Sequence, residues 1–276
     1  MSDAVTPAII IGDKPCSAEG RSPYETGLDR NAANFEALSP LSLLKRAARV
    51  YPDHPAIVHG GLRFTWRQTY ERCRRLASAL VRRGIAHLDT VSVIASNIPA
   101  LYEAHFGVPM AGAVLNTINT RLDAAAIAFI LDHGDSRLLL VSEDFAAAAR
   151  QAVALARNKP EILVIAEEGA PADSDYEQLL ASGDPEFAWH GPADEWQAIA
   201  LSYTSGTTGN PKGVVTHHRG AYLNALGNAL TWNMPAHPRY LWSLPMIHCN
   251  GGGVPWTLAA IAGTSSGRRK VNAAAV

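Results

Sequence analysis

The 276-residue chain has no excess of positive charge. It contains 24 Lys and Arg residues against 25 Asp and Glu residues, which gives a formal net charge of −1 at pH 7. A protein that gripped nucleic-acid backbones or an anionic membrane surface would carry a basic excess. The charge balance therefore argues against both kinds of partner.

Cysteine is scarce and the hydrophobic runs are short. The three cysteines, Cys16, Cys73 and Cys249, form no CxxC pair, so the sequence shows no zinc or disulfide signature and fits a reducing compartment. The longest apolar stretches, such as residues 124–131, fall far short of the roughly 20 residues that a membrane-spanning helix needs. We see no pattern of a secretory or peroxisomal signal, and we expect a cytoplasmic protein without a membrane span.

The composition is instead that of a globular α/β protein. Apolar residues make up 47% of the chain and charged residues 18%, which is enough to build a sizeable core. Residues 1–37 mix proline, glycine, serine and acidic residues without periodicity, and they predict a loosely ordered leader. The body of the protein is expected to begin at residue 38.

Apolar runs and helical patterns alternate along this body. The pattern predicts buried strands followed by helices, which favours layered, mostly parallel sheets flanked by helices. The predicted strands are 91–95, 138–141, 162–165 and 199–203, and the predicted helices are 100–110, 124–132 and 145–156. Residues 167–195 are rich in Glu, Asp, Pro and Gly and predict an irregular surface excursion.

Local signals define the first elements of the body. Ser39 followed by Pro40 is typical of a helix start, and Gly60-Gly61 predicts a tight hairpin between 56–59 and 62–65. Thr65 is expected to cap a long helix with an apolar face. Five arginines lie off that face, and we interpret them as a solvated surface: Arg72, Arg74, Arg75, Arg82 and Arg83.

A cluster of hydroxyl, glycine and lysine residues follows the apolar run 199–203. Polyphosphate binding uses such a mixture, because glycines let the backbone approach the ligand, hydroxyls donate hydrogen bonds and lysine supplies a positive charge. Neither a Walker A motif nor G-x-G-x-x-G is present. The same composition occurs in flexible surface loops, but a position at the carboxyl end of a buried strand favours a phosphate loop.

Residues 203–213, Y-T-S-G-T-T-G-N-P-K-G, resemble the signature of the AMP-binding (adenylate-forming) superfamily. Residues 244–251, L-P-M-I-H-C-N-G, resemble its next motif. Shorter stretches at 65–70, 97–99, 104–107 and 113–119 are similar to acyl-CoA synthetases of the short- and medium-chain, acetate/butyrate–CoA ligase-like branch.

This resemblance implies an ATP-dependent carboxylate–CoA ligase that activates a fatty or related acid. The carboxylate attacks the α-phosphorus of ATP to give an acyl-adenylate and pyrophosphate, and the thiol of CoA then displaces AMP. The implied small molecules are a carboxylic acid, ATP, Mg²⁺ and CoA as co-substrate. The phosphate-binding residues that the resemblance implies are Thr204, Ser205, Gly206, Thr207, Thr208, Gly209 and Lys212.

The second motif supplies the candidate acid pocket. His248 resembles the family's pocket histidine and, with Lys212, is a candidate catalytic residue, although a histidine at a strand end can also bond only its own backbone. Asn250 and Gly251 belong to the same motif. Trp256 either walls the pocket or is a core aromatic. The pair His217-His218 is interpreted as structural, because neighbours on a strand face opposite sides and cannot easily hold one ion.

The adenine, ribose and Mg²⁺ motifs of the family, and its small C-terminal domain, lie downstream of these motifs. The resemblance therefore implies that residues 38–276 are a partial N-terminal AMP-binding domain. Two alternatives to a CoA ligase stay open. One is a catalytically silent remnant or binding module of the same fold, and the other is an adenylate-forming enzyme with a different acceptor.

Overall fold

The computed structural model describes residues 22, 24, 27–166, 174–204 and 211–267. The chain divides into two units, Met1–Glu36 and Ala37–Val276. In the first unit the backbone N–H of Asn31 donates to Asn34 Oδ1 at 2.9 Å, and the Arg30 guanidinium lies over the Phe35 ring. All that follows concerns the second unit.

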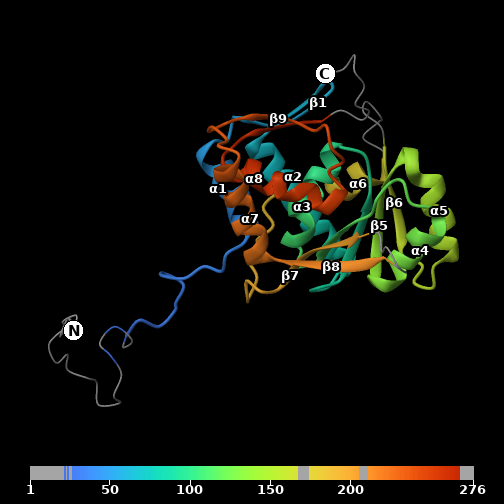
Figure 1. The fold of residues 1–276 in the computed structure, drawn as a ribbon, viewed down its shortest axis with the longest axis horizontal. Helices are drawn as coiled ribbons and strands as arrows, with labels where there is room; N and C mark the ends of the chain where they lie inside the picture. The colour runs from blue at the N-terminus through green and yellow to red at the C-terminus, as the bar shows by residue number, and fades with distance from the viewer. Residues whose placement is uncertain (1–21, 23, 25–26, 167–173, 205–210, 268–276) are drawn as a thin grey trace, which may run out of the picture. The chain divides into compact units, whose positions relative to one another are not determined.

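The larger of the two sheets in this unit has six strands (Figure 1). Its strand order is β6-β5-β3-β4-β7-β8, and all neighbours pair in parallel except β8, which is antiparallel to β7. The four predicted strands are confirmed within this sheet. The strands are β3 (Thr90–Ile94), β4 (Val114–Thr117), β5 (Ser136–Ser142), β6 (Glu161–Ile165), β7 (Ala198–Thr204) and β8 (Lys212–His217).

A four-stranded sheet in the order β2-β1-β10-β9 forms the second layer of strands. β1 and β2 are the predicted hairpin around Gly60-Gly61. β10 pairs in parallel with both β1 and β9, so it brings the end of the described chain into the interior of this sheet. The strands are β1 (Pro55–His59), β2 (Leu62–Thr65), β9 (Arg239–Leu241) and β10 (Thr264–Gly267).

Helices cover both faces of the six-stranded sheet, and the alternation of side chains along its strands explains why. On β5, Leu138 and Leu140 belong to the core shared with most of the helices. Leu139 and Val141 point the other way, into a separate core with α4 and α5. The helices are α1 (Pro40–Val50), α2 (Trp66–Arg82), α3 (Pro99–Met110), α4 (Ala124–His133), α5 (Ala146–Leu155), α6 (Asp175–Ser182), α7 (His218–Thr231) and α8 (Val254–Ala260).

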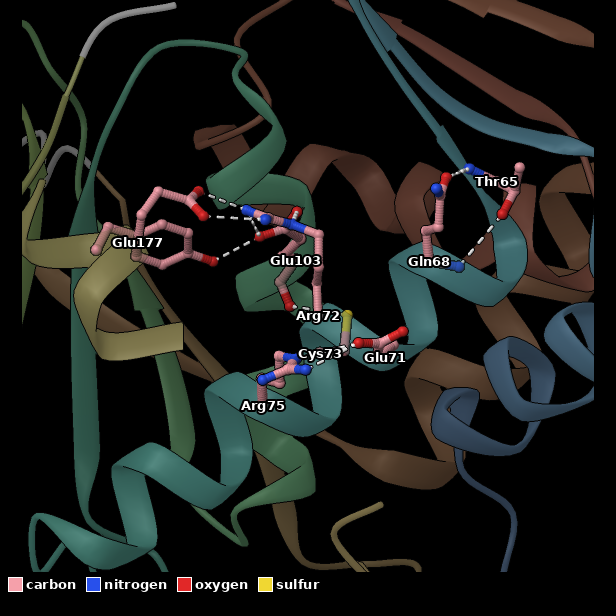
Figure 2. Close-up of polar contacts among 9 residues, drawn as sticks. Thr65, Gln68, Glu71, Arg72, Cys73, Arg75, Glu103 and Glu177 are labelled. Carbon is pink, nitrogen blue, oxygen red and sulfur yellow. Dashed lines mark hydrogen bonds and ion pairs between the residues drawn. The ribbon is translucent and has the colours of Figure 1, made fainter. Parts of the chain in front are cut away.

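The predicted helix starts are confirmed in atomic detail. The Ser39 side chain caps α1, with Pro40 at the first helical position. Thr65 and Gln68 form a reciprocal capping box at the start of α2 (Figure 2).

Contrary to the prediction from the sequence, residues 167–195 are not wholly irregular, because Ser174 caps the helix α6 inside them.

The prediction that the arginines of α2 form a simple solvated face was also wrong. These arginines bind the segment around α6 and the elements next to it. Their partners are Glu103 and Glu177 for Arg72, Glu186 for Arg74, the Gly183 carbonyl and Glu71 for Arg75, the Ser182 carbonyl for Arg82, and Glu161 for Arg83.

Candidate active site

The predicted phosphate loop joins β7 to β8. Thr204, the last residue of β7, pairs directly with Lys212, the first residue of β8, so the two ends of the loop lie side by side in an antiparallel hairpin. Both residues are exposed. The other predicted phosphate-binding positions, Ser205 to Gly209, lie outside the described residues.

β7 brings this hairpin to the edge of the sheet where three parallel strands end. β7 pairs in parallel with β4, which pairs in parallel with β3, so the carboxyl ends of all three strands lie at one edge. Open α/β sheets bind ligands at this edge because the loops that leave it diverge and expose backbone groups. The motif residues 244–250 reach the same edge from the other sheet.

Two polar side chains hold this second motif in place. Asn97, between β3 and α3, donates from Nδ2 to the Leu244 carbonyl at 2.8 Å and accepts from the Met246 N–H at 2.6 Å. The Thr117 hydroxyl, at the end of β4, donates to the Ile247 carbonyl at 2.8 Å. The sequence marked both residues only as parts of family-like stretches, and it gave no sign of this positioning role.

Asn250 is the most constrained of the predicted pocket residues. Its side chain is buried, its Nδ2 donates to Ser202 Oγ of β7 at 2.7 Å, and its Oδ1 lies 3.1 Å from the Thr117 hydroxyl. These contacts join the second motif to the strand that carries the predicted phosphate loop.

The turn that contains Asn250 needs its glycines. Residues 249–252 all have left-handed backbone angles, with φ between 48° and 62°, and Gly253 has φ of 80°. A Cβ on Gly251 would come within 2.8 Å of the Trp242 ring, and one on Gly253 within 2.2 Å of Asn224 Oδ1. The glycine run therefore builds a tight left-handed turn.

A cavity of about 420 Å³ lies between β8, α7 and this turn. Two of the predicted pocket residues, Asn250 and Trp256, line it. His248 is exposed, and neither it nor Gly251 is among the lining residues, although both belong to the same turn. Trp256 lines the cavity and is also a core aromatic, because it is 2% exposed and its Nε1–H donates to the His105 carbonyl at 3.1 Å.

Comparison with known proteins settles the family. The family model for "AMP-binding enzyme" matches residues 44–271. The chain belongs to the AMP-binding enzyme family. Its matched region contains both sequence motifs and all of the lining of the cavity.

The curated relatives of this AMP-binding chain include two plant ligases. The chain is 50% identical over 263 residues to the peroxisomal acetate/butyrate–CoA ligase AAE7 of Arabidopsis thaliana, and 46% identical over 266 residues to the acetate–CoA ligase CCL3 of Humulus lupulus. The matches cover 89% and 90% of this chain but only 46% and 47% of the relatives. The chain thus spans about half the length of these proteins.

A solved structure agrees with the fold. The inhibitor-bound N-terminal domain of FACL13 from Mycobacterium tuberculosis superimposes with a TM-score of 0.77 at 26% identity, over 86% of this chain and 58% of that one. The anthranilate–CoA ligase AuaEII, in complex with anthranoyl-AMP, shares the fold with a TM-score of 0.74 at 18% identity.

His217 lines the cavity, a role that the sequence did not predict, because the pair His217-His218 was interpreted as structural. It ends β8, caps α7 by accepting from the Gly220 N–H at 2.8 Å, and lines the cavity. His218 lies elsewhere: it is buried against Ser39, with Nδ1 and Oγ 2.9 Å apart, and burial lowers its pKa to about 4. Helical spacing gave no signal for this role, since His217 precedes α7 as its N-cap and has extended backbone angles.

The described residues offer no protein-built metal site. No group of three or more His, Cys, Asp or Glu side chains among them is placed to hold an ion. Within the same part of the chain, none of the helices is both long enough and apolar enough to traverse a bilayer.

Proposed function

We propose that this chain carries the phosphate- and acid-binding part of an ATP-dependent carboxylate–CoA ligase. In the first step a carboxylate oxygen bonds to the α-phosphorus of ATP and pyrophosphate leaves. In the second step the sulfur of CoA bonds to the acyl carbon, its proton is lost and AMP leaves. The observation that carries the proposal is the pairing of Thr204 with Lys212 next to the cavity along β8.

The hairpin suits the phosphate-binding role. Lys212 places a positive charge opposite the Thr204 hydroxyl at the loop's base, where the two can hold β- and γ-phosphate oxygens. Ser205, Thr207 and Thr208 supply further hydroxyl donors, and Gly206 and Gly209 give backbone access. Such positioned donors lower the barrier by neutralising the charge that repels the incoming carboxylate.

The cavity suits the acid. From Lys212 to Val215, the first lining residue on β8, is three residues of strand, or about 10 Å. An acid in this cavity can therefore direct its carboxylate toward the phosphate loop. Asn250, fixed by Ser202 and Thr117, lines the cavity and connects it to β7, and His248 and Gly251 belong to the same turn.

Mg²⁺ and CoA are implied by the ligase reaction. The described residues do not fit a protein-held Mg²⁺, because no carboxylate lines the cavity, and we derive no step through the ion.

The acid is a short- or medium-chain fatty acid or a related one. We assign residues 38–276 to a partial N-terminal AMP-binding domain and 1–37 to a leader. The cytoplasmic location stays a prediction.

The test is carboxylate-dependent exchange between ATP and pyrophosphate by the full 276-residue chain. Replacing Lys212 by alanine should lower the exchange rate about 10²- to 10³-fold, since it removes a charge that stabilises the transition state. Lys45→Ala, on the exposed side of α1, is the matched control and should leave the rate unchanged.

The outcomes separate the alternatives. Exchange without CoA-thioester formation, but with transfer to a carrier-protein thiol, would indicate a different acceptor. Absence of both exchange and ATP binding would indicate a silent module and would contradict the proposal. Equal rates for the Lys212 and Lys45 variants would contradict the phosphate-binding role.

A further inference from the structure

His217 is held in one orientation at the cavity wall. Its Nδ1 accepts the Gly220 N–H at 2.8 Å, and its ring stacks on Trp196 with centroids 4.2 Å apart and planes 19° from parallel. A Cβ on Gly220 would approach His217 Cε1 to 3.0 Å, so the ring depends on the glycine below it. A side chain fixed in this way is a preorganised binding group.

These contacts also fix the position of the proton. A neutral imidazole has one donor and one acceptor nitrogen. Because Nδ1 accepts from the backbone, we assign the proton to Nε2. No acceptor for this N–H occurs within the described ranges, while His217 lines the cavity. The donor is therefore available to a bound molecule.

Asn224 adds a second donor to the same cavity. It lies on α7, seven residues after His217, it lines the cavity, and its Oδ1 is 3.4 Å from Asn228 Nδ2. Its own Nδ2 has no acceptor in the part of the chain that the structure describes. Asn250, in contrast, has partners for both of its side-chain atoms.

The charge of the lining limits the ligand. No lysine or arginine is among the lining residues that the structure describes, so a second carboxylate on the acid would find no cation there. A plain alkyl chain would displace water from the N–H donors of His217 and Asn224, and it could not replace the hydrogen bonds that the water had accepted. A neutral oxygen satisfies both constraints.

We propose that the acid bound in this cavity carries a neutral oxygen acceptor, such as an oxo, ether or hydroxyl group, remote from its carboxylate, and that the Nε2–H of His217 donates to it. The inference rests on the proposed function, which places the acid in this cavity. Trp196 acts as a positioning residue, because it contacts the His217 ring and does not line the cavity.

Binding of matched acids to the full chain tests the proposal. The probes are levulinate against pentanoate and 7-oxooctanoate against octanoate, with dissociation constants from titration calorimetry in the presence and absence of ATP. We expect at least one oxo-acid to bind about tenfold more tightly than its alkyl partner. A tenfold ratio of dissociation constants is what one additional satisfied hydrogen bond contributes. His217→Asn keeps an acceptor for the helix cap. The N–H groups of its amide lie closer to the backbone than His217 Nε2 and do not replace that donor in the cavity, so the variant should reduce the ratio to about one.

His190→Asn is the matched control, because His190 is exposed and outside this cavity, and it should retain the wild-type ratio. An equal melting temperature for His217→Asn and wild type checks that the cap is kept. A preference for the oxo-acid in neither pair, or one that survives His217→Asn, overturns this inference and leaves the acid site standing. Failure of all four acids to bind, with or without ATP, overturns the proposed function as well.

Discussion

Arg72 lies between two carboxylates that come from different helices (Figure 2). Its guanidinium contacts Glu103 of α3 at 2.6 Å and Glu177 of α6 at 2.7 Å, and the Tyr176 hydroxyl donates to Glu103 at 2.7 Å. The Glu103 side chain is fully buried, whereas that of Glu177 is 41% exposed. Burial by itself would lower the pKa of Arg72, but the two carboxylates outweigh burial and hold this pKa above its ordinary value. One arginine therefore joins α2, α3 and α6.

Removing this arginine should be costly. In Arg72→Met the aliphatic stem is kept but Glu103 loses its counter-charge in a buried site, and we expect the free energy of unfolding to fall by roughly 3–5 kcal/mol. Urea denaturation measures this. Arg67→Ala is the control, because the Arg67–Asp53 pair is mostly exposed and should contribute no more than about 1 kcal/mol. Equal losses in the two variants would contradict the structural role of Arg72.

At the scale of elements, α6 depends on close contact with α2. The helix ends at Ser182, and Gly183 follows directly after it. A Cβ on Gly183 would come within 2.0 Å of the Arg75 carbonyl oxygen, which belongs to the backbone of α2 and cannot move aside as a side chain can. The glycine is thus required by space, since its own φ of −85° suits any residue.

Gly183→Ala should therefore separate α6 from α2. We expect unfolding to become easier by about 1–3 kcal/mol, the usual cost of overpacking, together with faster proteolysis of the 174–186 segment. Gly191→Ala is the matched control, because nothing lies within 4 Å of its added Cβ. Slower unfolding or unchanged proteolysis in Gly183→Ala would show that the segment adjusts without loss.

At the scale of the whole molecule, hydrophobic patterning predicted the parallel strands and their helices well. Continuous apolar runs such as that of β5 occur because both faces of the sheet are covered, and this physical cause is local enough to be visible in sequence. The role of the α2 arginines was not visible. A charged residue on a helix face appears the same in sequence whether it meets water or a carboxylate about 100 residues away, as Arg72 meets Glu177.

The candidate site was predictable only in part, for the same reason. Motif residues gave Lys212, Asn250 and Trp256, which the structure places on the β7–β8 hairpin and in the cavity wall. Thr117 acts through a contact to the second motif, and the His217 ring is held by Trp196 in addition to its local cap contact with Gly220. No short sequence pattern encodes the contacts to Trp196 and to the second motif.

Two buried histidines should make the stability of the whole unit depend on pH. Burial lowers the pKa of His105 and of His218 from 6.5 to about 4 in each case. Between these values the unfolded chain binds protons that the folded chain does not. The free energy of unfolding should therefore be level above pH 7 and fall as the pH drops from 6.5 toward 4, by up to about 3 kcal/mol per histidine.

Urea denaturation at pH 7.5, 6.5, 5.5 and 5.0 measures this dependence, and its slope rather than its absolute level is the informative quantity. The double variant His105→Gln/His218→Gln should be flatter over the same range, since glutamine does not titrate. His190→Gln, at an exposed position, should retain the wild-type slope. A wild-type curve that stays level down to pH 5, or a double variant as steep as wild type, would mean that these two imidazoles take up protons in the folded state as readily as in the unfolded one.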